Sequence, residues 1–152
     1  MKKKFALSLV AFASAALLAA CGEVSTNNSS ATGTEIGKTL KFGFNFEETG
    51  AVAAYGTAEQ HGAQLAVDEI NAAGGVDGKK IELTDKDNKS ETAEAATITT
   101  SLVTQDKVNT IIGPATSGAV AAAIANSGKA GVPLVTPSAT QDDLTNKQDY
   151  LY

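Results

Sequence analysis

Hydroxyl side chains gather in two short segments of this sequence, GPATSG at positions 113–118 and TPSAT at positions 136–140. Each follows a run of apolar and β-branched residues, as expected where a buried strand ends. Neutral hydroxyls and the free N–H groups at the start of a helix suit a carboxylate, and exposed carbonyl groups beside them suit an ammonium group. No lysine or arginine lies next to these segments, as a phosphate would favour. The two segments therefore predict a site for a ligand that carries both groups, an amino acid.

The same hydroxyls have a simpler interpretation. Ser117 and Thr140 could each do no more than cap the amino end of a following helix, which contributes about 1 kcal/mol per cap. A ligand site requires that the two preceding strands are neighbours in one sheet, because only then do the hydroxyls converge. The residues alone leave both interpretations open.

The elements that must position these segments follow from hydropathy patterns along the chain. Runs of β-branched, aromatic and aliphatic residues predict strands, and small and apolar residues at helical spacing predict helices between them. The expected strands span 39–46, 80–84, 108–113 and 132–137; the expected helices span 53–73, 88–106 and 117–128, with a further helical turn from 138. This alternation predicts an α/β fold, a three-layer αβα, Rossmann-like lobe with a parallel sheet. Ligands of such sheets bind at the carboxyl ends of the strands, where both hydroxyl segments lie.

The helix expected over 53–73 divides its residues between two faces. Polar residues lie on one of them, at Gln60, Gln64, Asp68 and Asn71. Small and apolar residues lie on the other, which we expect to face the sheet: Ala58, Gly62, Leu65, Ala66, Ile70 and Ala73.

Motifs of enzymes, cofactors and metals are missing from the sequence. GxGxxG does not follow the first strand, and GxxxxGK[ST] and GxSxG do not occur. One histidine, His61, and one cysteine cannot complete a metal site, and we interpret Asp85 and Asp87 as solvated or capping residues. The formal net charge is −5, and no basic block follows the first residues, so nucleic acid is not an expected partner. The sequence predicts a protein that is not an enzyme and uses no cofactor or metal.

Residues 1–20 have the features of a secretory signal peptide. Three lysines at positions 2–4 precede an apolar run that is shorter than the roughly 20 residues of a membrane-spanning helix. The segment ends in LAAC, which resembles a bacterial lipobox, so Cys21 is expected to carry a lipid that anchors the chain to a membrane. The alternative is an unmodified cysteine that is buried by chance. Residues 21–37, rich in Ser, Thr, Asn and Gly, predict a flexible tether, and the folded lobe is expected over 38–152.

The residues from 38 to the end resemble a known family. The segments TGAVAAYGTAEQHGAQLAVDEINAAGGVDGKKIEL, IIGPATSGAV and GVPLVTPSAT are together similar to those of the branched-chain amino acid binding proteins of ABC importers, which have the type I periplasmic-binding-protein fold. The resemblance implies two α/β lobes that close on an amino acid. It identifies this chain as the signal, the tether and an incomplete amino-terminal lobe, with the second lobe missing.

The resemblance also implies a role for each residue of the pocket. Ser117 and Thr140 would bind the ligand carboxylate through hydroxyl and N–H groups, and Ser138 would offer its carbonyl to the ammonium. Tyr55 would pack on the ligand side chain. Three small residues complete the wall, at Ala115, Thr116 and Ala139. Ser138 stands where the family often has alanine or glycine, which we expect to make the pocket more polar.

The function that these features imply is capture of a free amino acid by a lipoprotein on the extracellular or periplasmic side of the cell membrane. The lipoprotein would deliver the amino acid to the permease subunits of an ABC transporter. A ligand-sensing domain of a receptor, which uses the same fold, is the alternative. A hydrolase on a doubly wound sheet would need a nucleophile and base pair, which the sequence does not display.

Overall fold

The computed structural model describes residues 33–146 and 148–152. The predicted signal peptide, Cys21 and most of the predicted tether therefore lie outside the described residues. The elements are β1 (Leu40–Phe46), α1 (Ala53–Ala72), β2 (Ile81–Asp87), α2 (Thr92–Ser101), a short π-helical turn η1 (Leu102–Asp106), β3 (Thr110–Ile112), α3 (Ser117–Ala130) and β4 (Leu134–Val135).

The four strands form one parallel sheet in the order β2-β1-β3-β4. Phe44 of β1 stands opposite Asp85 on one side and Ile112 on the other, and Ile111 stands opposite Leu134. The strands β3 and β4, which precede the two hydroxyl segments, are therefore neighbours. The predicted fold class is confirmed, and so is the condition for the hydroxyls to converge.

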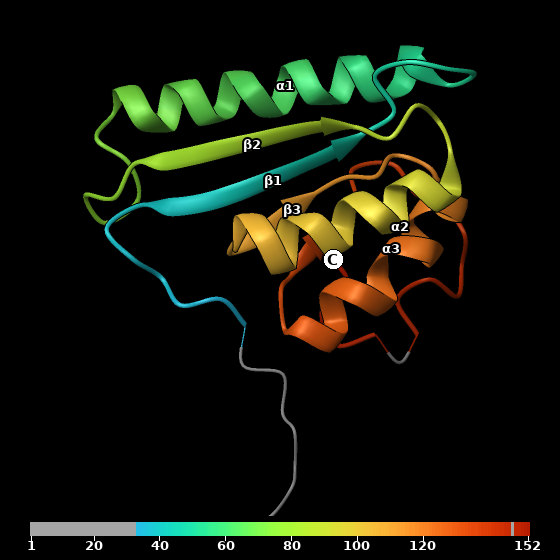
Figure 1. Cartoon of the computed structure of the whole chain (residues 1–152). Helices are drawn as coiled ribbons and strands as arrows, with labels where there is room; N and C mark the ends of the chain where they lie inside the picture. Colours follow the sequence, from blue (N-terminus) through green and yellow to red (C-terminus); the bar gives the residue numbers. More distant parts are fainter. Residues whose placement is uncertain (1–32, 147) are drawn as a thin grey trace, which may run out of the picture.

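The side chains of β1 alternate between two helical layers. Phe44 and Phe46 are fully buried on the face that α1 covers, where their rings meet edge to face at 5.5 Å. Asn45 and Glu47, also fully buried, point to the other face, which α2 and α3 cover (Figure 1). A larger apolar core lies on that second face, around Leu102, Ile111 and Val120 and the residues near them. The lobe is thus a three-layer αβα sandwich, as predicted.

The face of α1 that meets the sheet differs from the predicted one. Gly56 and Val67 are its buried residues, whereas Leu65 of the predicted face is 59% exposed and Ile70 is 37% exposed. Two of the polar residues of the other predicted face, Gln60 and Asn71, bond to β2 instead. Asn71 pairs through its side-chain amide with the backbone N–H and carbonyl of Ile81, at 2.7 and 2.9 Å. The prediction failed because alanine and glycine recur all round this helix, so small residues do not mark its inward side.

Several helices and strands also begin or end at residues other than the predicted ones. β2 continues to Asp87, three residues beyond the expected strand, and α2 begins at Thr92. α3 runs past Gly128 and ends at Ala130, because the left-handed C-cap is Gly131, with a φ of 71°. The residues after Pro137 form hydrogen-bonded turns rather than a helix, for example from Gln141 to Leu144.

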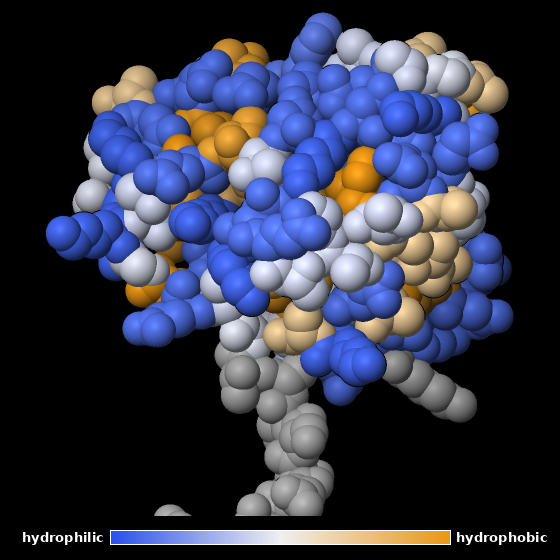
Figure 2. Space-filling model, viewed as in Figure 1, coloured by the Kyte–Doolittle hydropathy of each residue, from blue (hydrophilic) through white to orange (hydrophobic). Residues whose placement is uncertain are grey.

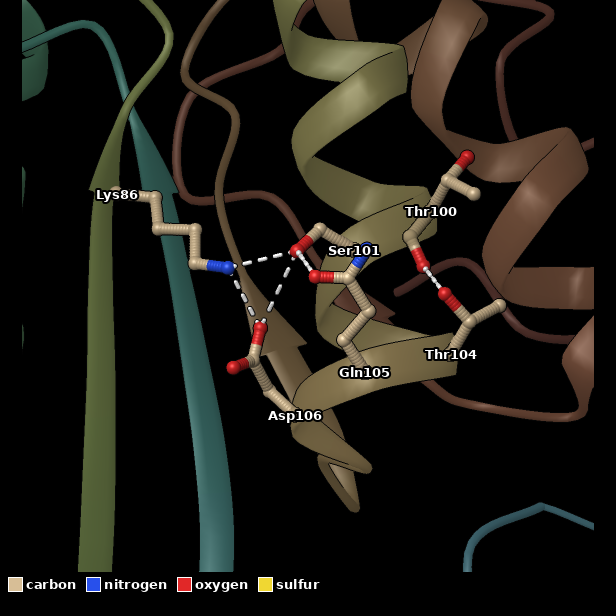
Figure 3. Close-up of polar contacts among 6 residues, drawn as sticks. All are labelled: Lys86, Thr100, Ser101, Thr104, Gln105 and Asp106. Carbon is tan, nitrogen blue, oxygen red and sulfur yellow. Dashed lines mark hydrogen bonds and ion pairs between the residues drawn. The ribbon is translucent and has the colours of Figure 1, made fainter.

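The turn η1 closes the second helical segment and is tied to the sheet by an ion pair. The Lys86 ammonium lies 2.6 Å from the Asp106 carboxylate and donates to the Ser101 hydroxyl at 2.8 Å (Figure 3). Both charged side chains are partly exposed, so the pair contributes little stability. None of these three residues belongs to the hydroxyl segments, so this contact serves the packing of α2 and η1 on the sheet.

Residues 33–37, the described end of the predicted tether, lie against the amino-end edge of the sheet. The Gly33 N–H donates to the Ala130 carbonyl, and the Asn109 side chain donates to the Thr34 and Glu35 carbonyls. Figure 2 shows mainly hydrophilic residues on the face of the lobe seen in Figure 1, with apolar residues in separate spots. Within the described residues, none of the helices is long and apolar enough to span a membrane.

Candidate functional site

A hollow of about 370 Å³ lies where β1, β3 and β4 end. Three short segments form its walls: the start of α1, the loop between β3 and α3, and the loop after β4. The lining residues are Val52, Tyr55, Ala115, Thr116, Ser117, Ser138 and Thr140. The structure thus brings together every predicted ligand-binding residue except Ala139, which packs against the apolar core and donates its N–H to the Thr136 hydroxyl.

Ser117 joins two of the walls. It is the first residue of α3, and its hydroxyl oxygen accepts from the N–H groups of Thr140 and Gln141, both at 3.2 Å. Since both lone pairs of this oxygen are engaged, its own proton remains to donate. The interpretation of Ser117 and Thr140 as simple N-caps is wrong: the N-cap of α3 is Thr116, which makes no side-chain capping bond, and no helix among the described residues begins at Thr140.

Glu47 binds the N–H groups that sequence reasoning left free for a ligand. One carboxylate oxygen accepts from the Ala115 N–H at 2.9 Å, and the other accepts from the Thr116 N–H at 3.2 Å and the Thr116 hydroxyl at 2.8 Å. The side chain is fully buried. The amino end of α3 therefore holds an anion that belongs to the protein itself, and the donors left near the hollow are those of Ser117 and of the loop after β4.

The loop after β4 is bonded to the same wall. The Thr136 hydroxyl donates to the Pro114 carbonyl at 2.7 Å, and the Ser138 hydroxyl donates to the Ala115 carbonyl at 3.0 Å. The Ser138 proton is therefore committed to the wall, so this serine adds less polarity to the hollow than we expected. Its backbone carbonyl stays available for the predicted contact with an ammonium group.

A family model described as periplasmic binding protein matches residues 39–152. The chain belongs to the periplasmic binding protein family. Its lobe has the type I fold of that family, and the family is extracytoplasmic.

Individual relatives agree with this assignment. A Leu/Ile/Val-binding protein, BraC3, from Rhizobium johnstonii is 40% identical over 65% of this chain and 27% of its own length. The substrate binding protein LivJ of Streptococcus pneumoniae, solved in complex with isoleucine, is 75% identical and superimposes with a TM-score of 0.74 over 75% of this chain and 33% of its own. The leucine binding protein LivK of Thermotoga maritima is 28% identical, with a TM-score of 0.69 over 74% and 31%. This chain thus spans a third or less of the length of each relative.

The names of these relatives describe binding proteins, in one case the substrate binding protein of an amino acid transporter, which agrees with the prediction that the chain is not an enzyme. Among residues 33–146 and 148–152, no group of three histidine, cysteine or acidic side chains is arranged to hold a metal ion.

Tyr55 stands at the mouth of the hollow of this periplasmic binding protein. It lies near the start of α1, and 66% of its surface is exposed. Its neighbour Gly56 packs on the backbone of Glu47 so closely that a Cβ at this position would overlap the Glu47 carbonyl oxygen. The glycine therefore fixes how near the first turn of α1, and Tyr55 with it, comes to the end of β1.

Three acidic side chains, Glu48, Asp85 and Asp87, lie near the carboxyl ends of β1 and β2. Burial, together with the nearby charges of Asp85 and Asp87 and a hydrogen bond with Asp85, raises the pKa of Glu48 to about 7. Burial also acts to raise the pKa of Asp87, but hydrogen bonds from the Thr49 hydroxyl and from three backbone N–H groups outweigh it and lower this pKa below its usual value. Asp85 accepts a bond from the Gln60 side chain at 2.6 Å. These carboxylates order the turn after β1 and do not line the hollow.

Two residues of the site were missed by sequence reasoning. Val52 precedes α1 in a stretch that looks like an ordinary glycine-containing loop. Glu47 stands one residue past the strand, in FNFEETG, where an acid suggests a solvated turn. The alternation of β1 was a usable signal, because Gly43, Asn45 and Glu47 share one face, and that face is covered by helices.

Proposed function

We propose that this protein is an extracytoplasmic solute-binding lipoprotein that captures a branched-chain or similar amino acid and delivers it to an ABC permease. The observation that carries the proposal is the hollow at the strand ends, where hydroxyl, N–H and carbonyl groups of two neighbouring loops meet beside an aromatic ring. The names and ligands of the relatives support an amino acid as the solute.

The proposed roles follow the two ends of the ligand. The free proton of the Ser117 hydroxyl donates to the ligand carboxylate, and the N–H and hydroxyl of Thr140 add to it, the N–H turning from its 3.2 Å bond with Ser117. The Ser138 carbonyl accepts from the ammonium. Tyr55 packs on the ligand side chain. Small residues at Ala115 and Thr116 leave room for it.

The proposed anchor agrees with the path of residues 33–37. They approach the amino-end edge of the sheet, next to Asn109 and Ala130, while the hollow lies at the carboxyl-end edge. A lipid on Cys21 would therefore be connected to the lobe through this segment, at the edge of the sheet opposite the hollow.

Calorimetry on a chimera tests the ligand. The chimera carries this chain and continues after Tyr152 with the remaining residues of the Streptococcus pneumoniae relative. We expect a dissociation constant in the micromolar range or below for at least one of leucine, isoleucine and valine, near −8 kcal/mol. Isoleucine amide, which lacks the carboxylate, should bind at least about 10-fold more weakly. A folded chimera that binds none of the three amino acids would refute the proposal.

A further inference from the structure

We infer that Glu47 is a positioning residue for the ligand site: its buried carboxylate holds the wall formed by Ala115, Thr116 and Ser117 in the conformation that binds the ligand. The inference rests on the proposed function, since it concerns the same hollow. It adds a residue that does not line the hollow and that would not touch the ligand.

Hydrogen bonds satisfy the charge of the Glu47 carboxylate. Within the described part of the chain, no lysine or histidine forms an ion pair with it. A buried carboxylate is tolerated only when hydrogen bonds replace water. Here the replacements are three donors from two consecutive residues, Ala115 and Thr116, at the amino end of α3, where the helix dipole also favours a negative charge. The donors of this loop therefore stabilise the buried charge, and the carboxylate in turn fixes the position of the loop.

All three walls of the hollow meet at Glu47 or at its partner Ala115. The Glu47 side chain binds the wall before α3, and its backbone is the surface on which Gly56 and the start of α1 rest. The Ala115 residue that donates to Glu47 through its N–H also accepts, through its carbonyl, the hydroxyl of Ser138 on the third wall. A change of the Glu47 side chain would thus reach Ser117 and Ser138 together, through Thr116 and Ala115.

Glu47 also limits the hydrogen-bond donors that a ligand can use. Because Glu47 engages the N–H groups of Ala115 and Thr116, a ligand carboxylate is left with Ser117 and the loop after β4. All amino acids share that carboxylate. Loss of the Glu47 contact should therefore weaken binding of every amino acid ligand by a similar factor and leave the order of preference unchanged.

The test compares Glu47→Gln with a matched control, Asn45→Ala, in the chimera. Asn45 is also fully buried, lies on the same face of β1 and makes three hydrogen bonds, but its partners are on α2 and at Asn88 rather than at the hollow. The amide that replaces the carboxylate would turn an N–H group toward at least one of the former donors. We expect Glu47→Gln to weaken leucine, isoleucine and valine binding about tenfold or more and by similar factors, and Asn45→Ala to change binding by less than about threefold despite a comparable loss of melting temperature.

Several outcomes would overturn the inference. If Glu47→Gln binds as tightly as the parent, or if Asn45→Ala loses as much affinity at equal loss of stability, Glu47 is only a structural residue and the inference is overturned. If Glu47→Gln does not fold, Thr116→Val replaces it, since it removes one donor to Glu47 and keeps the side-chain shape. Unchanged affinity in a folded Thr116→Val chimera would equally overturn the inference. A parent chimera that binds no amino acid refutes the proposed function instead, so the two failures are distinguishable.

Discussion

The sequence predicted one anion site at the start of α3, formed by a hydroxyl and free N–H groups. In the structure Glu47 binds the N–H groups of Ala115 and Thr116, and the Ser117 hydroxyl lines the hollow. This hydroxyl keeps a proton that we propose it donates to a ligand. Residue types and spacing predicted the place of Ser117 at the end of a strand, because a hydroxyl after a buried strand is visible in a sequence. They did not predict Glu47, because its role depends on a partner 68 positions away in the chain.

Replacement of Ser117 by alanine should weaken ligand binding by the loss of one hydrogen bond to a charged group. Such bonds contribute about 1.5–3 kcal/mol, so the dissociation constant of the chimera should rise roughly 10- to 150-fold in calorimetry. Ser101→Ala is the control, since this hydroxyl serves the Lys86 and Asp106 pair (Figure 3) and does not line the hollow. Equal affinities for the parent and the Ser117 variant would remove this residue from the site.

Glu48 should make the stability of the lobe fall as the pH rises. Its pKa in the folded chain is about 7, against 4.5 for an ordinary glutamate, because of burial and of Asp85 and Asp87. A raised folded pKa means that its contribution is complete below pH 4.5 and is lost as the pH rises through 7. Asp87 acts in the opposite direction, but only at lower pH, because its pKa lies below the usual 3.8.

Urea unfolding between about pH 4.5 and about pH 8 measures this effect. The free energy of unfolding of the parent should decline over that interval, and in Glu48→Gln the decline should be smaller. Parallel pH profiles for the two proteins would show that Glu48 is not the group responsible.

At the scale of elements, the strand and helix order was predictable and the contacts between elements were less so. The alternating pattern indicated four strands, three helices and a parallel sheet because β-branched runs and glycine stops are local signals. The inward face of α1 was predicted wrongly, since Leu65 and Ile70 face outward while Asn71 bonds to Ile81 of β2. The end of α3 was placed at Gly128 instead of Gly131, because only φ distinguishes the glycine that caps from the one inside the helix.

Two glycines of α1 provide a test of how this helix docks. At Gly56 a Cβ would overlap the Glu47 backbone, whereas at Gly62 no atom lies within 4 Å of it. Alanine is the better helix former by about 1 kcal/mol. Gly62→Ala should therefore stabilise the chain by up to about that amount in urea unfolding, and Gly56→Ala should destabilise it. Stabilisation by both substitutions would mean that α1 does not rest on the end of β1.

At the scale of the whole molecule, the arrangement separates the described start of the chain from the hollow that we propose binds the ligand. Residues 33–37 reach one edge of the sheet and the hollow occupies the other. The predicted anchor at Cys21 and the predicted tether precede this segment and lie outside the described residues. Their assignment depends on LAAC and on a polar composition, both of which are readable only from the sequence.

Lipidation of Cys21 should determine whether the protein stays with membranes. Cys21→Ala should release the protein into the soluble fraction. The lipid stabilises membrane binding by about 0.8 kcal/mol per buried methylene, and once the signal peptide is cleaved off, no other proposed membrane anchor remains. Fractionation of cells after a high-salt wash, with immunodetection of parent and variant, measures this. A variant that remains in the membrane fraction would contradict the proposed lipid anchor.

We propose that an amino acid binds at the ends of β1, β3 and β4 through Ser117 and the loop after β4. The most direct test is an amide NMR titration of the labelled chimera with isoleucine. We predict that the largest shifts within the lobe fall on the amides of Ser117, Thr140 and Gln141. A second hollow, next to Val103, Thr104 and Lys107, offers an internal comparison. Largest shifts around that second hollow, or none at Ser117 and Thr140 at saturating isoleucine, would contradict the claim.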